Sequence, residues 1–337
     1  MRNSPKPQAQ SREPLHARGA WSGNLPPMIE LIGVPFDLTG KYFGSRLGPE
    51  ALRLADIAKT FEALGHKVKD HGDLPKPKEV TAKEGLRNFQ PLLSCISEVK
   101  STVTASIKRK SIPIVMGGDH AISIGSVAGA LAAHEDTALL WVDAHADVNT
   151  PATSPSGNAH GMPIGALHGL PSGVSGVPDR EWKQLLKAMG PTRLKPARTA
   201  WFGLREVDLG ERAHTHEPSL AIAMDCIDRR GIEQTVNTFD EWMRATGCKH
   251  LWISFDVDCF DPVFAPGTGT AVRGGLTYRE GHLFAELLYR KLASGPYSLA
   301  GLDLMEVNPI RDTTNMTAAV TVEWAASLFG KTILGKR

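Results

Sequence analysis

Runs of consecutive apolar residues, many of them β-branched, alternate along the chain with stretches in which apolar residues recur every three or four positions. The apolar runs are Ile29–Val34, Ile112–Met116, Ala138–Val142, Thr199–Phe202, Leu220–Met224, His250–Phe255 and Tyr297–Leu304. The helical stretches include Gly48–Leu64, His120–Ala133, Arg229–Thr246 and Thr277–Ala293. Continuous hydrophobic strands separated by helices predict a mostly parallel sheet covered on both faces, which is a three-layer α/β/α fold.

Length and local composition set the expected organisation of the chain. The 337 residues can bury one large core, so we expect a single domain over residues 28–337. Residues 1–27 carry scattered basic residues among Pro, Gln, Ser and Gly, which predicts a disordered extension, with organelle targeting as the alternative. Residues 149–190 are rich in Gly, Pro and Ser, and we expect them to form a long substrate loop over the strand ends.

Charge and cysteine usage narrow the classes of partner. The net charge of +2 is too small to indicate a basic surface that binds nucleic acid. No apolar stretch reaches the roughly 20 residues needed to cross a bilayer. We therefore expect a small-molecule substrate, no nucleic acid and no membrane. The four cysteines are scattered without Cys-x-x-Cys pairs, which argues against a disulfide framework and a thiolate metal site and favours the cytoplasm.

Candidate metal ligands follow three of the apolar runs. Asp143, His145 and Asp147 end the run at Ala138–Val142, and His120 closes a Gly-Gly-Asp-His string after Ile112–Met116. Asp256 and Asp258 follow His250–Phe255 in the same way. Alone, the Gly-Gly-Asp-His string could be a turn with a satisfied histidine, and Asp256 and Asp258 could belong to a helix cap or a solvated loop. The three clusters take equivalent places at the carboxyl ends of strands, where open parallel sheets bind their ligands.

The charges in these clusters indicate a pair of metal ions. Four aspartates would converge without a comparable group of Lys or Arg nearby in sequence, and like charges at close range raise carboxyl pKa values strongly. Divalent cations remove this conflict. Carboxylate oxygens with two imidazoles and no thiolate suit Mn²⁺ or a similar ion. We therefore expect two Mn²⁺ per subunit, with Ni²⁺ or another divalent ion as the alternative.

The ordered set of motifs resembles the ureohydrolase family, and within it the arginases most closely. The matching strings run in the family's order through almost the whole chain after residue 28: Gly117–His120, Asp143–Asn149, Ser156–Pro163, Ser254–Asp258, Asp261–Pro262, Gly267–Thr270, Gly274–Gly281 and Met305–Pro309. The resemblance implies an arginase-like fold. It also implies a binuclear-metal hydrolase that cleaves the guanidinium of L-arginine to L-ornithine and urea by a metal-bridging hydroxide.

The resemblance assigns roles to the candidate residues. It implies one ion held by His120, Asp143, Asp147 and Asp256, and the other held by Asp143, His145, Asp256 and Asp258. His160 resembles the proton shuttle, Asp147 would also orient the hydroxide, and Glu306 would bind the guanidinium by a charge-assisted pair. Without the family, His160 could be a loop histidine and Glu306 a surface acid.

Substrate choice is expected to depend on polar residues around the loop. By the resemblance, the α-carboxylate would meet Asn149, Ser154, Ser156 and Asn158, and the α-amino group would meet Asp208 with Glu211 near it. Thr270 would line the guanidinium end. The chain departs from the usual pattern at Ala121, Leu209 and Cys259, which leaves every ligand in place and bears on fine specificity alone.

Three other functions can be weighed against arginase activity. Another ureohydrolase could act on agmatine, a guanidino acid or guanidine, and Gly44–Arg53 is somewhat similar to agmatinases. A non-catalytic relative should have lost ligands, and none is missing here. A nucleotide-binding protein would need a Gly-x-Gly-x-x-Gly spacing, which Gly117-Gly118 lacks. The family also implies a homotrimer or homohexamer, and Arg279 with Glu280 matches a region used at trimer contacts.

Overall fold

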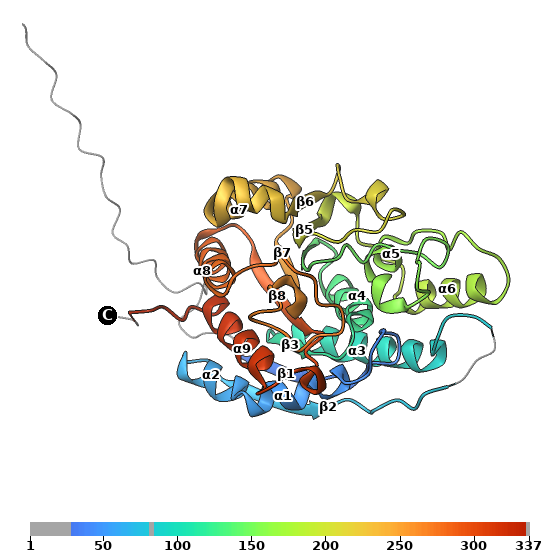
Figure 1. Cartoon of the computed structure of the whole chain (residues 1–337), viewed down its shortest axis with the longest axis horizontal. Coiled ribbons are helices and arrows are strands. Elements are labelled where there is room, and N and C mark those ends of the chain that lie inside the picture. Colours follow the sequence, from blue (N-terminus) through green and yellow to red (C-terminus); the bar gives the residue numbers. More distant parts are fainter. Residues whose placement is uncertain (1–27, 81–83, 335–337) are drawn as a thin grey trace, which may run out of the picture.

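A single parallel sheet forms the centre of the computed structural model, which describes residues 28–80 and 84–334. The eight strands lie in the order β2-β1-β3-β8-β7-β4-β5-β6, and every pairing is parallel (Figure 1). The expected extension at residues 1–27 lies outside the described residues. The strands are β1 Ile29–Gly33, β2 Val68–Asp73, β3 Ile112–Met116, β4 Thr137–Val142, β5 Thr199–Leu204, β6 Leu220–Ala223, β7 His250–Asp256 and β8 Ser298–Met305.

Helices cover both faces of the sheet, which confirms the predicted three-layer fold. Neighbouring residues of β4 enter opposite cores, with Leu140 in one and Trp141 in the other. This alternation is what a strand buried on both faces requires. One face is covered by α1 Gly48–Leu54, α2 Ile57–Ala63, α7 Met224–Thr246, α8 Tyr278–Ser294 and α9 Met316–Leu328, and the other by α3 Phe89–Lys108, α4 Ser123–Ala133, α5 Pro163–His168 and α6 Val177–Ala188 (Figure 1).

Several element boundaries differ from the sequence expectation. The helix expected over Gly48–Leu64 is two helices, because Asp56 between them adopts a left-handed backbone with φ 60°. The strand expected to end at Met224 ends one residue earlier, and Met224 begins α7. The edge strand β2 was not expected, because its residues are mostly polar and exposed and show no apolar run. Its position at the edge explains this composition.

The expectation of one long loop over residues 149–190 was wrong. That segment contains α5 and α6, and Leu167, Trp182 and Leu185 from them are buried in the core. Proline stands in the first turn of both helices, and Gly169 caps the end of α5 with φ 71°. The glycines and prolines therefore mark helix ends. Within this segment, the irregular backbone lies chiefly before α5 and in the connection between α5 and α6.

The sheet order brings β3, β8, β7 and β4 together at its centre. Because the strands are parallel, the residues that follow them emerge at one edge of the sheet. Gly118 makes a close approach possible after β3, since a Cβ atom there would overlap the carbonyl oxygen of Phe36. Within the part of the chain that the structure describes, no helix has the length and apolar run needed to cross a bilayer.

Candidate metal centre

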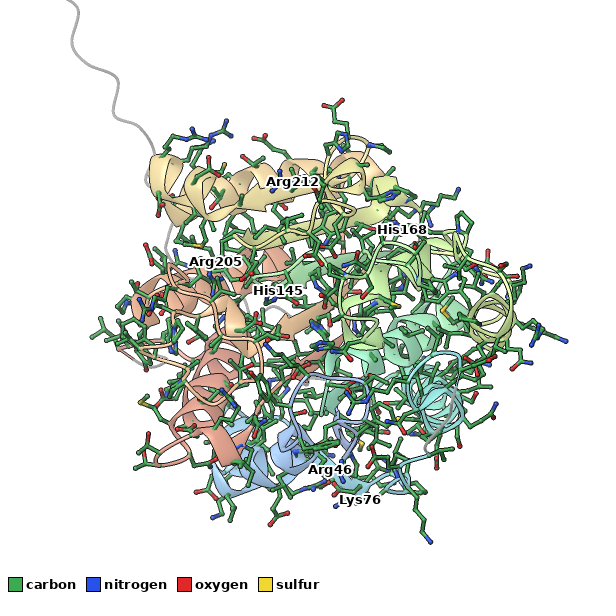
Figure 2. The ribbon with its side chains drawn as sticks, turned by 45° about the vertical axis from the view of Figure 1, so that its right-hand side comes forward. Arg46, Lys76, His145, His168, Arg205 and Arg212 are labelled. Carbon is green, nitrogen blue, oxygen red and sulfur yellow. The ribbon has the colours of Figure 1, made fainter. Side chains whose placement is uncertain are left out.

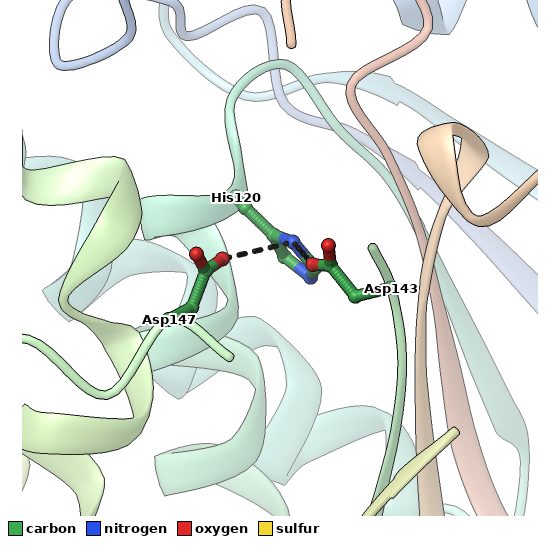
Figure 3. A group of neighbouring side chains, drawn as sticks. All are labelled: His120, Asp143 and Asp147. Atoms are coloured by element: carbon green, nitrogen blue, oxygen red, sulfur yellow. Dashed lines mark ion pairs between the residues drawn. The ribbon is translucent and has the colours of Figure 1, made fainter. Parts of the chain in front are cut away.

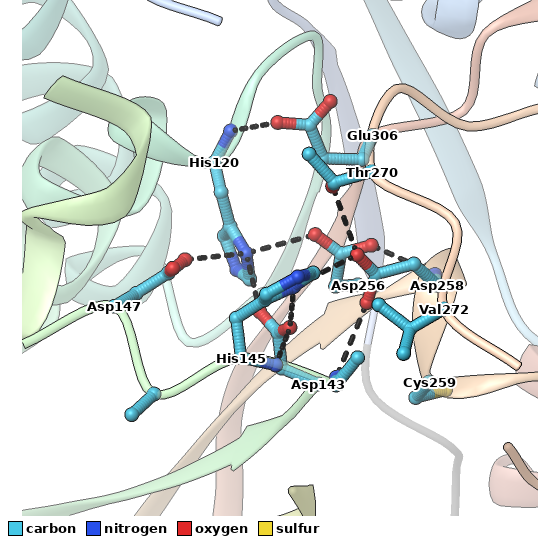
Figure 4. Close-up of polar contacts among 12 residues, drawn as sticks. His120, Asp143, His145, Asp147, Asp256, Asp258, Cys259, Thr270, Val272 and Glu306 are labelled. Carbon is cyan, nitrogen blue, oxygen red and sulfur yellow. Dashed lines mark hydrogen bonds and ion pairs between the residues drawn. The ribbon is translucent and has the colours of Figure 1, made fainter. Parts of the chain in front are cut away.

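The expected ligands meet where the central strands end. His120 lies in the 3₁₀ turn that follows β3, Asp143 directly follows β4, and Asp256 is the last residue of β7. His145 and Asp147 continue the chain from Asp143, so three nearby residues deliver ligands from one strand end. Figure 4 shows these side chains, with Asp258, pointing toward one another from separate elements. The convergence that the sequence predicts is therefore present.

A first group of ligand atoms surrounds the His120 ring. His120 Nδ1 lies 3.0 Å from Asp143 Oδ2 and 3.4 Å from Asp147 Oδ2 (Figure 3), and 3.1 Å from Asp256 Oδ2 (Figure 4). His120, Asp143 and Asp147 could hold one ion together, and all three are buried. Asp256 Oδ1 accepts a hydrogen bond from the backbone N–H of Asp258 at 2.8 Å, which leaves Oδ2 directed at His120.

A second group lies beside the first and shares Asp143 with it. His145 Nδ1 lies 3.3 Å from Asp143 Oδ1 and 3.1 Å from Asp258 Oδ2. These three residues could hold a second ion. Asp143 thus directs one oxygen to each group, as the resemblance implied for a bridging ligand. The contribution of Asp256 to this second group stays a prediction, because its contacts are with His120 and the Asp258 backbone.

The electrostatics of the cluster fit a pair of cations. Burial, followed by the charge of neighbouring carboxylates, raises the pKa of Asp147 and Asp256 well above the ordinary range, and that of Asp258 also rises. His120 Nδ1 and Asp143 Oδ2 are buried and make no hydrogen bond of acceptable geometry with any described residue. Buried carboxylates and a bare imidazole nitrogen facing one point are the donor set of a metal site.

The orientation of His120 is fixed from behind. Its Nε2 lies 2.9 Å from Ser254 Oγ, and its ring stacks on Trp141 with centroids 3.8 Å apart. Ser254 Oγ in turn lies 2.9 Å from Ser123 Oγ. Partners of this kind hold a ligating imidazole in one orientation and tautomer. No role was predicted for Ser254 from the sequence, although it stands two residues before Asp256 and therefore on the same face of β7.

The backbone is unusual at two of the proposed functional positions. Asp147 and Glu306 are not glycines, yet they adopt φ angles of 52° and 62°. A left-handed backbone at such residues costs free energy and persists where the surrounding contacts require it. Both residues direct carboxylates into the cluster, so the strained backbone accompanies the placement of charged side chains.

His160 and Glu306 lie together above the first group. Glu306 Oε1 accepts a hydrogen bond from the backbone N–H of His120 at 3.0 Å and lies 3.2 Å from His160 Nδ1. Burial alone would lower the pKa of His160, but the hydrogen bond and charge of Glu306 raise it overall. The pair therefore combines an anion suited to a guanidinium with an imidazole that can carry a proton.

Asp119 is a buried acid near this pair that was not predicted from the sequence. Its Oδ2 accepts hydrogen bonds from the backbone N–H and the hydroxyl of Thr39, each at 2.9 Å. Burial and the charge of Glu306 raise the pKa of Asp119 to about 7. The sequence signal that could have pointed to Asp119 as a site residue is its place within the Gly-Gly-Asp-His string. Asp119 anchors the segment after β1 beside the proposed proton carrier.

The expected substrate residues divide into two sets. Near the metal ligands, Thr270 donates a hydrogen bond to Asp258 Oδ2 at 3.0 Å. In the loop before α5, Asn149 Nδ2 donates to Asp208 Oδ2 at 2.9 Å, so the residues proposed for the two ends of an amino acid contact each other. Glu211 is buried and accepts from the backbone N–H groups of Val148 and Asp208 at 2.9 Å, which makes it a support of this loop.

Serines in the same loop shape its backbone. The hydroxyl of Ser154 accepts a hydrogen bond from the Gly157 N–H at 3.0 Å, and that of Ser156 accepts from the Asn158 N–H at 3.2 Å. Ser156 is exposed, whereas Ser154 and Asn158 are half-buried. The structure thus brings the expected metal ligands, His160, Glu306 and Thr270 together, and it places Ser154, Ser156 and Asn158 in a separate, more exposed turn.

The departures from the family pattern leave the cluster intact. Cys259 is buried behind Asp258, and burial raises the pKa of its thiol well above the ordinary value, so it remains a neutral core residue. Leu209 is 82% exposed and packs in neither core.

Arg279 and Glu280, which match a region used at trimer contacts, both have partners within the chain. Arg279 contacts Glu286, and Glu280 completes a capping box with Thr277 at the start of α8.

Comparisons with known proteins identify the family. A model of the arginase family matches residues 28–330. The arginase of Staphylococcus aureus strain MRSA252 is 35% identical over 312 residues, covering 91% of this chain and 98% of that protein. The arginase of Bacillus subtilis strain 168 is 36% identical over 308 residues, covering 91% and 99%. The native structure of Bacillus caldovelox arginase matches with a TM-score of 0.82 at 36% identity, covering 91% and 100%.

These matches extend over nearly all of the described residues and agree with the resemblance carried by the sequence motifs. The similar structures share the arrangement of helices around a mostly parallel sheet. In this chain, the clustered His and Asp side chains lie at the carboxyl edge of the sheet. The chain belongs to the arginase family and is a ureohydrolase, an enzyme that hydrolyses a carbon–nitrogen bond of a guanidino group.

Proposed function

We propose that the chain hydrolyses L-arginine to L-ornithine and urea with two Mn²⁺ per subunit. The observation that carries this proposal is the position of Asp143, whose two carboxylate oxygens face the two ligand groups. The first ion would be held by His120, Asp143, Asp147 and Asp256, and the second by Asp143, His145, Asp256 and Asp258. Dependence on two metal ions is a property of the family, and the mixed oxygen and imidazole donors without a thiolate favour manganese.

Hydrolysis joins the oxygen of water to the guanidinium carbon, breaks one of its carbon–nitrogen bonds and returns a proton to the leaving amine. When bound, a pair of divalent cations makes water reactive near neutral pH. Glu306 is proposed to bind the guanidinium, because its carboxylate already lies within the cluster and an ion pair would fix the carbon above it. Asp147 is proposed to orient the attacking water.

His160 is proposed to carry the proton to the leaving amine. Its Nδ1 contacts Glu306 Oε1, so the ring lies beside the atoms that would hold the guanidinium. The raised pKa keeps the imidazole protonated to higher pH than an isolated histidine. A group that can donate a proton near neutral pH, within reach of the leaving group, is what this step requires.

Selection of arginine is proposed to depend on the loop before α5. Asn149, Ser154, Ser156 and Asn158 would bind the α-carboxylate, and Asp208 would meet the α-amino group with Glu211 supporting it. Support comes from the Asn149–Asp208 contact, in which a neutral donor meets an acid, and from the exposed turn that Ser154 and Ser156 shape. Thr270 would line the guanidinium end, next to Asp258.

A substrate panel tests this proposal. The protein, loaded with Mn²⁺, is assayed for urea release from L-arginine, agmatine, guanidino acids and guanidine. We expect L-arginine to be strongly preferred in kcat/KM, because the other compounds lack the α-amino acid group or part of it. Equal or better turnover of agmatine or guanidine would contradict the arginase assignment and leave the ureohydrolase class in place.

The proposed function also includes an oligomeric state and a cellular compartment. We propose a homotrimer or homohexamer that acts in the cytoplasm, on the basis of the family resemblance and the scattered cysteines. Sedimentation of the purified protein measures the assembly directly, and a monomer at working concentrations would contradict it.

A further inference from the structure

Arg205 lies at the end of β5 and contacts both chain segments that carry the second ligand group, Asp143, His145 and Asp258. Its backbone N–H donates a hydrogen bond to the carbonyl of Ala144 at 2.9 Å. Ala144 stands between Asp143 and His145, and its own N–H donates to Asp258 Oδ1 at 3.2 Å. The backbone of Arg205 therefore fastens the strand-end segment after β4.

The guanidinium of Arg205 fastens the other segment. Arg205 Nη2 donates to the carbonyl of Asp258 at 2.5 Å and to that of Val272 at 2.7 Å. Longer bonds from the same side chain reach the carbonyls of Gly203, Cys259 and Phe260, at 3.3 to 3.4 Å. Figure 2 labels Arg205 and His145 in the whole molecule, and Figure 4 shows Asp258, Cys259 and Val272 beside the ligands.

The contact with Val272 extends this effect to Thr270. Thr270 stands two residues before Val272, and its hydroxyl donates a hydrogen bond to Asp258 Oδ2, the oxygen that faces His145. One side chain thus holds the main chain of Asp258 and the segment that positions its carboxylate. Among the described residues, Arg205 forms no ion pair with a carboxylate, so its planar fork of donors is committed to carbonyl oxygens.

The first ligand group has separate supports. His120 is held by Ser254 and by stacking on Trp141, and the carbonyl of Asp147 accepts from the Ile164 N–H at 2.8 Å. None of the hydrogen bonds of Arg205 reaches these residues. The contacts of Arg205 therefore bear mainly on the second group, since the only part of the first group that they reach is the segment carrying the shared Asp143.

We propose that Arg205 is a positioning residue that sets how tightly the second ligand group holds its ion. The proposal rests on the two-metal function proposed above. A lysine at this position would keep the charge, but a single ammonium cannot serve the carbonyls of both Asp258 and Val272 with the same geometry. Loss of such outer contacts lowers metal affinity by roughly 10–100-fold in comparable sites.

Manganese binding to the metal-free protein tests this inference in Arg205→Lys and Arg205→Gln. The matched control is Arg198→Gln at the opposite end of β5, where Arg198 Nη1 donates to the Glu135 carbonyl at 2.7 Å. We expect both Arg205 variants to keep one ion with about the parent affinity and to bind the other roughly 10–100-fold more weakly. At limiting Mn²⁺, the electron paramagnetic resonance spectrum of each Arg205 variant should be that of an isolated ion, whereas the spectrum of the parent protein should be that of a coupled pair. His145→Ala provides the reference spectrum, and the control should match the parent.

The outcomes separate this inference from the function on which it rests. Two ions bound to the Arg205 variants with parent affinities would overturn the role of Arg205. Equal weakening of both ions, together with a lower melting temperature of the metal-free variant, would also overturn it by showing a general loss of structure. A single ion in the parent protein would instead contradict the proposed two-metal function itself.

Discussion

Histidine and aspartate side chains cluster at both ends of the sheet, but their polar atoms are satisfied in different ways. At the amino end, the His134 and His250 rings stack with centroids 3.6 Å apart, and Asp136 Oδ1 lies 2.6 Å from His250 Nδ1. Asp136 Oδ2 accepts from the Lys249 N–H. At the carboxyl end, His120 Nδ1 and Asp143 Oδ2 have no hydrogen-bond partner among the described residues.

The difference shows that residue types alone do not define a metal site. At the amino end, the two imidazole rings lie in nearly parallel planes, with an angle of 2° between them, and the single acid is paired with His250 and the Lys249 N–H. At the carboxyl edge, four buried carboxylates and two imidazoles direct their ligand atoms at shared points, and burial, followed by the charge of neighbouring carboxylates, raises the pKa of Asp147, Asp256 and Asp258. Convergence of buried ligand atoms that shift one another's pKa values is therefore the informative property.

The largest effect should come from removing the carboxylate shared by both ligand groups. We expect Asp143→Ala to lose both ions and to release urea at least roughly 10³-fold more slowly, because metal activation contributes several kcal/mol to lowering the barrier. Elemental analysis after dialysis and a urea assay measure the two results. The matched change at the other end, Asp136→Ala, should leave both unchanged. Retention of two ions in Asp143→Ala would contradict the shared-ligand assignment.

A smaller effect is expected from His160→Asn, which tests a group that lies beside the cluster without joining it. Metal content should stay at the parent level, since His160 contacts Glu306 and no proposed ligand. Turnover at neutral pH should fall by roughly 10²-fold, the lower range for loss of a positioned proton donor. Loss of metal from this variant would show that His160 is a ligand and that our assignment is wrong.

Substrate selection should respond more weakly to changes in the loop. We expect Asn158→Ala to lower kcat/KM for arginine by roughly tenfold, the equivalent of one hydrogen bond to a charged group, and to change agmatine turnover little. Ser175→Ala, at an exposed position in the connection between α5 and α6, serves as the control and should leave both substrates unaffected. An equal loss for both substrates in Asn158→Ala would remove Asn158 from carboxylate binding.

The smallest effect should follow from a change within the amino-end cluster. Burial, followed by the charge of His250, lowers the pKa of His134 below 6.5, so the folded protein takes up this proton less readily than the unfolded chain. Stability from this group is present above pH 6.5 and falls as pH drops below it. In His134→Gln, the free energy of unfolding should decline less between about pH 7 and pH 5, with metal content unchanged. An unchanged slope would show that His134 does not titrate as described.

Much of the layered fold was predictable from the sequence, because strands buried on both faces appear as continuous apolar runs. Strand β2 was not, since an exposed edge strand has no such run. The break at Asp56 depends on a left-handed backbone that the apolar pattern does not reveal. Residues 149–190 were misinterpreted because the same glycines and prolines that suggest a loop also mark the ends of α5 and α6.

Some residues of the candidate site were also predictable from the sequence, and others were not. His120, Asp143 and Asp258 were predictable because their strand ends place ligands at one edge of the sheet. Arg205 was not, since its shortest side-chain hydrogen bonds go to backbone carbonyls more than fifty residues away in sequence, which carry no side-chain pattern. The Asn149–Asp208 contact likewise joins two loops whose approach depends on the tertiary structure.

Two ions held by this cluster are expected to act together in hydrolysis. The direct measurement is a titration of metal-free protein with Mn²⁺, following bound metal and urea release from L-arginine in the same samples. We predict that activity rises with occupancy and reaches its maximum at two ions per chain, because Asp143 serves both ligand groups. Full activity with one tightly bound ion per chain would contradict the account.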